Sequence, residues 1–254
     1  MSTAKLIQPL ASLTFLLAGS LSYAQPAAAA MFNGHFTQGL EGWQTSGDVS
    51  VQPGQPWGSS SPFSALLTTA SARGWDDYPA PAGSYNFSGF DPTWIDFGPA
   101  SMEDFLGIPR GSLPENSTHG SAFKQEITVQ VGDILEFDWN FLTNERTPDY
   151  LDYAFVWLDG YRELANTSAS FLPSATPFGR ETGFQTFSHT FTQAGTYTLA
   201  LGVVDRIDLD VSSGLLISNV RVTSSVSVPN STPQLGLTLL GLGGLAAIFR
   251  KARS

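Results

Sequence analysis

The chain of 254 residues contains no cysteine and only three histidines. Without cysteine it can form neither disulfide bonds nor thiolate-dependent sites. The histidines, His35, His119 and His189, are too far apart in sequence to form a zinc-binding helix motif. The sequence also lacks a Gly-x-Ser-x-Gly nucleophile turn, a phosphate-binding loop and a dinucleotide fingerprint. Because helical periodicity is almost absent as well, stability must come mainly from sheet packing.

Basic residues are scarce in the middle of the chain. Between residues 31 and 227 there are 8 basic and 22 acidic side chains, which give a formal charge of −14. A body with this charge repels nucleic acid and anionic lipid headgroups. The charge therefore excludes nucleic acid as a partner and favours divalent cations or neutral glycans.

The first 30 residues have the pattern of a secretory signal peptide. Lys5 gives a weakly cationic start, residues 6–21 are mostly apolar, and small residues precede the candidate cleavage sites after Ala24 and Ala30. We therefore expect a signal peptide within residues 1–30, export through the Sec translocon, and cleavage by signal peptidase after Ala24 or Ala30. An uncleaved membrane anchor is the alternative.

The last 31 residues read as a linker and sorting motif over 224–234, an apolar segment over 235–249 and a basic tail over 250–254. A helix over 235–249 would be roughly 22 Å long and would insert in the membrane, with the cations behind it facing the cytoplasm. The tail resembles the PEP-CTERM sorting signal of bacterial surface proteins. The residues that carry the resemblance are Val228, Pro229, the Gly/Leu-rich run over 239–246, and the cations Arg250, Lys251 and Arg253. This resemblance implies recognition by an exosortase-like membrane enzyme, which anchors the ectodomain at the cell envelope or releases it outside the cell. The alternative is that the tail is a simple single-pass membrane anchor.

Alternation of apolar and polar residues predicts β-strands through the middle of the chain. The predicted strands span 123–131, 135–141, 153–158, 184–191, 196–204 and 215–222, and the turn at 193–195 predicts a short hairpin. Trp139 shares a strand face with Leu135, Phe137 and Phe141, so we expect it in the core. We predict an all-β fold, a two-sheet antiparallel jelly-roll sandwich over 31–223.

Two segments of this region add a second resemblance. The opening Asn33-Gly34-His35-Phe36, followed by Gly39 to Trp43, and the closing Leu215 to Val220 resemble the first and last strands of carbohydrate-binding modules and galactose-binding-like jelly rolls. The resemblance implies a sandwich that binds polysaccharide.

A long insertion over 71–119 interrupts the strand pattern. It contains six prolines and many aromatic residues, and a short helix is predicted over 101–106, with Ser101 as N-cap and Gly107 at its end. One interpretation makes four of the aromatics, Trp75, Tyr78, Tyr85 and Trp94, a surface on which sugar rings stack. The other interpretation has them fold back as a lid over a sheet edge or an end of the core, and we favour this one.

Two acidic clusters are candidate calcium sites. The first contains Asn144, Glu145, Asp149 and Asp152, and the second contains Asp205, Asp208 and Asp210. Calcium binds six to eight oxygen ligands, and closely spaced carboxylates otherwise repel one another. Aspartates in solvated turns are the alternative, since neither cluster has the spacing of an EF-hand loop.

These observations together indicate an exported, non-enzymatic protein of the cell surface or extracellular matrix with a structural or glycan-binding sandwich. A secreted carbohydrate-active enzyme that uses two carboxylates is one alternative. A purely adhesive matrix protein with no defined ligand is another.

Overall fold

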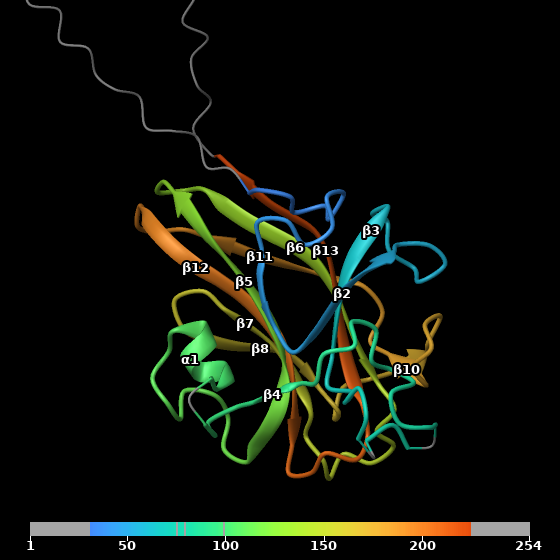
Figure 1. Ribbon diagram of the computed structural model, residues 1–254. Coiled ribbons are helices and arrows are strands. Elements are labelled where there is room, and N and C mark those ends of the chain that lie inside the picture. The colour runs from blue at the N-terminus through green and yellow to red at the C-terminus, as the bar shows by residue number, and fades with distance from the viewer. Residues whose placement is uncertain (1–30, 75, 79, 99, 225–254) are drawn as a thin grey trace, which may run out of the picture.

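The computed structural model describes residues 31–74, 76–78, 80–98 and 100–224, and these form two facing β-sheets (Figure 1). Within these residues the first sheet contains β1 (Gln44–Ser46), β4 (Thr93–Trp94), β5 (Ser117–Val129), β7 (Tyr153–Trp157), β8 (Tyr161–Asn166) and β12 (Gly195–Arg206). The second contains β2 (Asp48–Pro53), β3 (Phe63–Thr68), β6 (Ile134–Thr143), β9 (Leu172–Pro173), β10 (Arg180–Glu181), β11 (Gln185–Thr190) and β13 (Ser213–Thr223). Neighbouring strands pair antiparallel, which confirms the predicted sandwich.

The core lies between the sheets and follows the alternation of the sequence. On β5, Phe123, Ile127 and Val129 face inward, and on β6 Phe137 and Trp139 face them from the other sheet. Trp139 is 6% exposed, which confirms the prediction that it is buried.

The predicted hairpin at 193–195 is wrong. The strands on either side of this turn, β11 and β12, lie in different sheets: β11 pairs with β6 and β12 pairs with β5 and β7. The chain also crosses between sheets from β5 to β6, from β6 to β7 and from β12 to β13, which is the connectivity expected of a jelly roll. The short turn at 193–195 therefore connects one sheet of the sandwich to the other.

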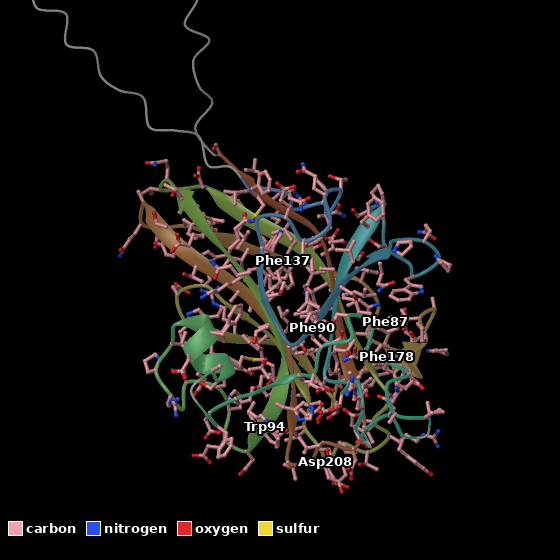
Figure 2. The ribbon with its side chains drawn as sticks, viewed as in Figure 1. Phe87, Phe90, Trp94, Phe137, Phe178 and Asp208 are labelled. Atoms are coloured by element: carbon pink, nitrogen blue, oxygen red, sulfur yellow. The ribbon has the colours of Figure 1, made fainter. Side chains whose placement is uncertain are left out.

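The insertion covers the outer faces of both sheets. Its first half carries Tyr85 and Phe87 onto Leu66, Leu142 and Leu216 of the second sheet. Figure 2 shows Phe87 and Phe178 close together on that side. Its second half contains the helix α1 (Met102–Leu106), whose apolar side chains pack on the outer face of the first sheet.

Helix α1 forms where the sequence predicts it. The Ser101 hydroxyl accepts a hydrogen bond from the Asp104 N–H at 3.2 Å, and Gly107 ends the helix in the left-handed conformation with φ 75°. Because α1 covers the first sheet, β7 is buried on both sides. Tyr153, Phe155 and Trp157 face the insertion while Ala154 and Val156 face the core, which is why both faces of this strand are apolar.

Buried carboxylates hold the insertion in place. The Asp48 carboxylate accepts the backbone N–H groups of Phe87 and Ser88, and Glu103 accepts those of Gly111 and Leu113 at 2.8 and 2.9 Å. Both acidic side chains are at most 1% exposed. They supply acceptors that the irregular backbone lacks because it is in neither sheet.

In the described residues, no helix is long and apolar enough to cross a membrane. The predicted signal peptide over 1–30, the sorting residues Val228 and Pro229, the apolar segment over 235–249 and the basic tail all lie outside these residues.

Replacing Glu103 with alanine should lower the free energy of unfolding by about 2 to 4 kcal/mol, because two backbone donors lose their acceptor. Chemical denaturation measures the change. Asp104→Ala is the matched control, since that carboxylate is exposed and pairs with Arg110 at the surface. Equal stability of the two variants would contradict the role given to Glu103.

Candidate functional site

A pocket of about 440 Å³ opens at the end of the sandwich where the insertion meets the β12–β13 loop. This is the lower end in Figures 1 and 2, where β4 and Trp94 are labelled. We call it the Trp94 pocket, and it is lined by Ser71, Gly74, Asp76, Asp91, Pro92, Trp94, His119, Leu209 and Asp210. The insertion supplies most of the wall, β5 supplies His119, and the β12–β13 loop supplies the last two residues.

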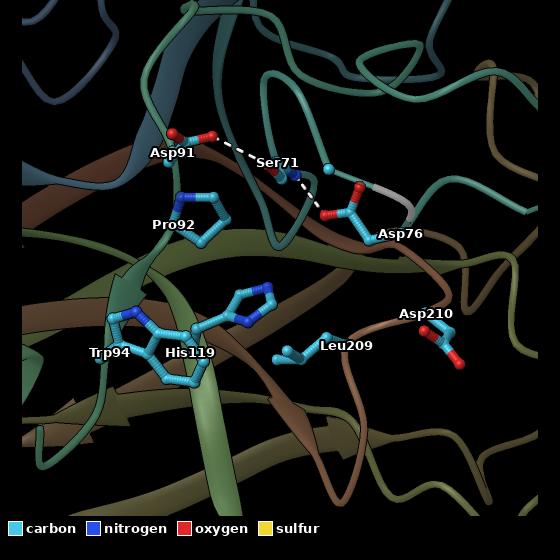
Figure 3. Close-up of a pocket in the computed structure, with 9 residues that line it drawn as sticks. Ser71, Asp76, Asp91, Pro92, Trp94, His119, Leu209 and Asp210 are labelled. Carbon is cyan, nitrogen blue, oxygen red and sulfur yellow. Dashed lines mark hydrogen bonds between the residues drawn. The ribbon is translucent and has the colours of Figure 1, made fainter.

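Ser71 joins two of the acidic residues in the wall (Figure 3). Its backbone N–H donates to Asp76 Oδ2, and its hydroxyl donates to Asp91 Oδ1 at 2.9 Å. The Ala72 N–H also donates to Asp91 Oδ1, at 2.8 Å. The two carboxylates are therefore fixed in position before any ligand arrives.

Trp94 and His119 form the aromatic part of the pocket. β4 pairs with β5 so that Trp94 lies opposite His119, and their rings meet edge to face with centroids 5.8 Å apart. Trp94 is 49% exposed whereas His119 is 7% exposed. The indole thus offers an open apolar surface at the entrance, and the imidazole lies deeper.

The acidic residues of the pocket carry uncompensated charge. Burial raises the pKa of Asp76 to about 6, and the charges of Asp77 and Asp91 add to the rise, while the hydrogen bond from Ser71 opposes it. At neutral pH this carboxyl is still mainly ionised. Among the described residues, no lysine or arginine forms an ion pair with Asp76, Asp91 or Asp210.

Beneath the pocket, His119 contacts a buried carboxylate. Its Nε2 lies 2.9 Å from the carbonyl oxygen of Thr69 and 3.2 Å from Asp205 Oδ2. Since a carbonyl oxygen can only accept, Nε2 carries the proton. Burial lowers the pKa of His119, so the ring is neutral at neutral pH.

Asp205 and Asp152 form a buried carboxylate pair. Asp152 accepts hydrogen bonds from Ser213 Oγ at 2.6 Å and from the Arg206 N–H at 3.1 Å. Neither oxygen of Asp205 has a hydrogen bond of good geometry within the described part of the chain. Burial raises the pKa of Asp205 well above its ordinary value, and the charge of Asp152 raises it further. Because Asp152 has the donors, Asp152 is the first of the two to ionise as the pH rises, and Asp205 keeps its proton to higher pH.

The predicted sugar-stacking residues do not form one surface. Tyr78 is 73% exposed, whereas the Tyr85 ring packs against Phe178 with centroids 4.9 Å apart, as the lid interpretation expects. Trp94 lines the pocket, and Trp75 lies outside the described residues. Tyr85 also borders a separate, smaller pocket of about 260 Å³, so the described members of the set do not share one site.

One residue from each predicted acidic cluster contributes to the buried carboxylate pair, and the other members lie in separate places. Asp152 of the first lies beside Asp205 of the second, while Asp210 lines the Trp94 pocket. The remaining members are placed as follows: Asn144 and Glu145 accept backbone N–H groups, Asp149 is exposed, and the Asp208 carbonyl oxygen accepts from Thr118 Oγ1. In the described ranges no group of three or more acidic or histidine side chains is arranged to hold a metal ion. Calcium binding stays a prediction.

Four polar residues of the pocket are not predicted from the sequence: Ser71, Asp76, Asp91 and His119. They are spread over the insertion and the start of β5, and no spacing rule joins them. The one available signal in the sequence is the pair Asp76-Asp77, which lies between two aromatic residues, Trp75 and Tyr78.

No family model and no curated protein sequence matches the chain. Among solved structures, it is similar to the carbohydrate-binding module TmCBM61 in complex with β-1,4-galactotriose, at 12% identity and a TM-score of 0.38, covering 78% of this chain and 99% of that one. It is also similar to the K3 cleaved adhesin domain of Lys-gingipain from Porphyromonas gingivalis, at 14% identity and a TM-score of 0.40, covering 77% and 99%. At these TM-scores the likeness assigns neither a family nor a ligand.

The carboxylate pair should make the protein less stable as the pH rises from about 4 to about 7. Burial raises the pKa of Asp152 from 3.8 to about 7, so the unfolded chain loses this proton first and the free energy of unfolding falls across that interval. Asp205→Asn removes one titrating group and should flatten the fall in melting temperature. Asp159→Asn, an exposed change, should leave the slope as it is. If the melting temperature depends on pH in the same way in the wild type and in both variants, the carboxylate pair holds no buried proton.

If calcium binds the acidic residues, it should do so mainly above pH 7, where the carboxylate pair loses its proton and the site gains charge. We expect millimolar calcium to raise the melting temperature at pH 8 and not at pH 5, relative to EDTA. Equal melting temperatures at both pH values would remove the calcium prediction.

Proposed function

We propose that this protein is an exported, non-catalytic, glycan-binding β-sandwich and that the Trp94 pocket receives the sugar. The observation that carries the proposal is the combination of a half-exposed indole and fixed carboxylates in one concave site. The flat apolar face of a sugar ring covers an indole well, and its hydroxyl groups donate to carboxylates. Small-molecule sites share this pattern of an apolar wall with a few convergent polar groups.

The support beneath the pocket favours binding with little rearrangement. Ser71 fixes Asp76 and Asp91, and strand pairing fixes Trp94 opposite His119. A site that is already ordered loses less conformational entropy when a ligand binds.

Export and attachment belong to the same proposal and are supported by the sequence. The N-terminal pattern indicates the Sec translocon and signal peptidase as partners. The tail with Val228, Pro229, Arg250, Lys251 and Arg253 indicates an exosortase-like enzyme and a membrane helix over 235–249. The protein would then present its pocket to polysaccharide at the envelope or in the extracellular matrix.

One observation favours hydrolysis as a second candidate. A carboxyl with a pKa of about 6, as at Asp76, suits a general acid, and Asp91 and Asp210 line the same pocket. Release of shorter sugars during the binding experiment below, lost in Asp76→Asn, would replace binding by catalysis. Glycan retention without any release would favour the binding function.

Trp94→Ala should weaken binding to a retained neutral polysaccharide roughly tenfold or more, because the stacking surface is lost. Affinity electrophoresis of the full chain over a panel of neutral polysaccharides measures the change. Phe63→Ala is the matched control, an exposed aromatic on β3 away from the pocket. Tyr78→Ala tests the wider stacking surface and should leave retention unchanged. Retention of Trp94→Ala at the level of the wild type would overturn the proposal.

A further inference from the structure

The wall of the Trp94 pocket contains three carboxylates and no cation. Asp76, Asp91 and Asp210 all line it, and His119, the remaining titratable group of the lining, is neutral. The described arginines that form ion pairs, Arg110, Arg162 and Arg221, pair with Asp104, Asp159 and Glu136, outside the pocket. A ligand that enters the pocket therefore meets negative charge that the protein does not balance.

One carboxylate atom in the wall lacks a donor. Asp76 is 3% exposed, and its Oδ1 has no hydrogen-bond partner among the described residues, although Oδ2 accepts from the Ser71 N–H. A methyl group added at Gly74, which also lines the pocket, would lie 3.5 Å from this Oδ1. A buried acceptor without a donor is costly, so this atom favours a ligand that brings one.

Trp94 adds a second preference for positive charge. An indole face attracts ammonium groups through its quadrupole, and it is the strongest of the aromatic side chains in this respect. The pocket thus combines the two features that recognise an ammonium group, an open indole face and nearby carboxylates.

We propose that the Trp94 pocket selects saccharides that carry a free ammonium group, that is, hexosamine units without their acetyl group. This inference rests on the proposed glycan-binding function and names its ligand class. The ammonium group would donate to Asp76 Oδ1, with Asp91 and Asp210 adding negative charge to the wall, while the sugar ring covers Trp94. A bare divalent cation fits less well, because no group of three metal-binding side chains is formed in the described ranges.

The test compares β-1,4-linked oligomers of glucosamine, of N-acetylglucosamine and of glucose, with equal numbers of sugar units, by calorimetry on the full chain at pH 6.5 and low salt. We expect the glucosamine oligomer to bind roughly tenfold more tightly than either neutral oligomer, since a hydrogen bond to a buried charged group such as Asp76 is worth about this much. Oligolysine of equal charge is the fourth ligand and should bind more weakly, because it has no ring to cover Trp94.

Asp210→Asn is the cleanest variant, because that side chain is exposed and has no hydrogen bond within the described residues to lose. It should lower affinity for the glucosamine oligomer several-fold more than affinity for the neutral oligomers. Asp159→Asn removes the same charge far from the pocket and should reduce neither.

Each other result has a definite meaning. Equal affinity for glucosamine and a neutral oligomer would overturn the ammonium preference and leave the glycan-binding function standing. Binding of oligolysine as tight as that of glucosamine, unchanged in Trp94→Ala, would show general attraction to an acidic surface and overturn the inference. Failure of all three sugars and of every neutral polysaccharide in the panel would overturn both proposals.

Discussion

Buried carboxylates that accept backbone N–H groups are the constraint on which the rest of the structure depends. A long irregular segment can be buried only if its backbone donors find acceptors, and the sheets cannot supply them. Asp48 and Glu103 each take two such donors from the insertion, and Asp77 takes the N–H of Ser84 and the hydroxyl of Ser212. The insertion can therefore lie tightly on the sandwich without forming long strands.

This attachment also creates the pocket. The two halves of the insertion cover different sheets, and the chain between them passes the end of the sandwich with Asp91, Pro92 and Trp94. At that end the β12–β13 loop approaches with Leu209 and Asp210. A concave site thus forms where neither half of the insertion closes over the core, and the buried pair of Asp152 and Asp205 lies in the sandwich nearby.

The sequence predicts the sandwich because each strand repeats a two-residue pattern that one buried face requires. The sequence does not show which face of its strand Trp157 lies on, since a strand covered on both faces loses that pattern. It also does not distinguish a hairpin turn at 193–195 from a connection between the two sheets. The site is harder to predict than the fold. The sequence assigns Trp94 to a sugar-stacking surface and Asp210 to an acidic cluster. Only the pairing of β4 with β5 and the position of the β12–β13 loop bring the two residues together. Asp76 and Ser71 become informative only once their hydrogen bond is known.

The Trp94 pocket is assembled from segments made at different times during synthesis. Ser71 emerges early, whereas Leu209 and Asp210 emerge just before the last described strand, β13. Contacts between such distant segments bear a large loss of chain entropy and tend to form late. A chain that has not yet placed β12 and β13 would have no complete pocket, so the pocket is completed only when the sandwich itself is complete.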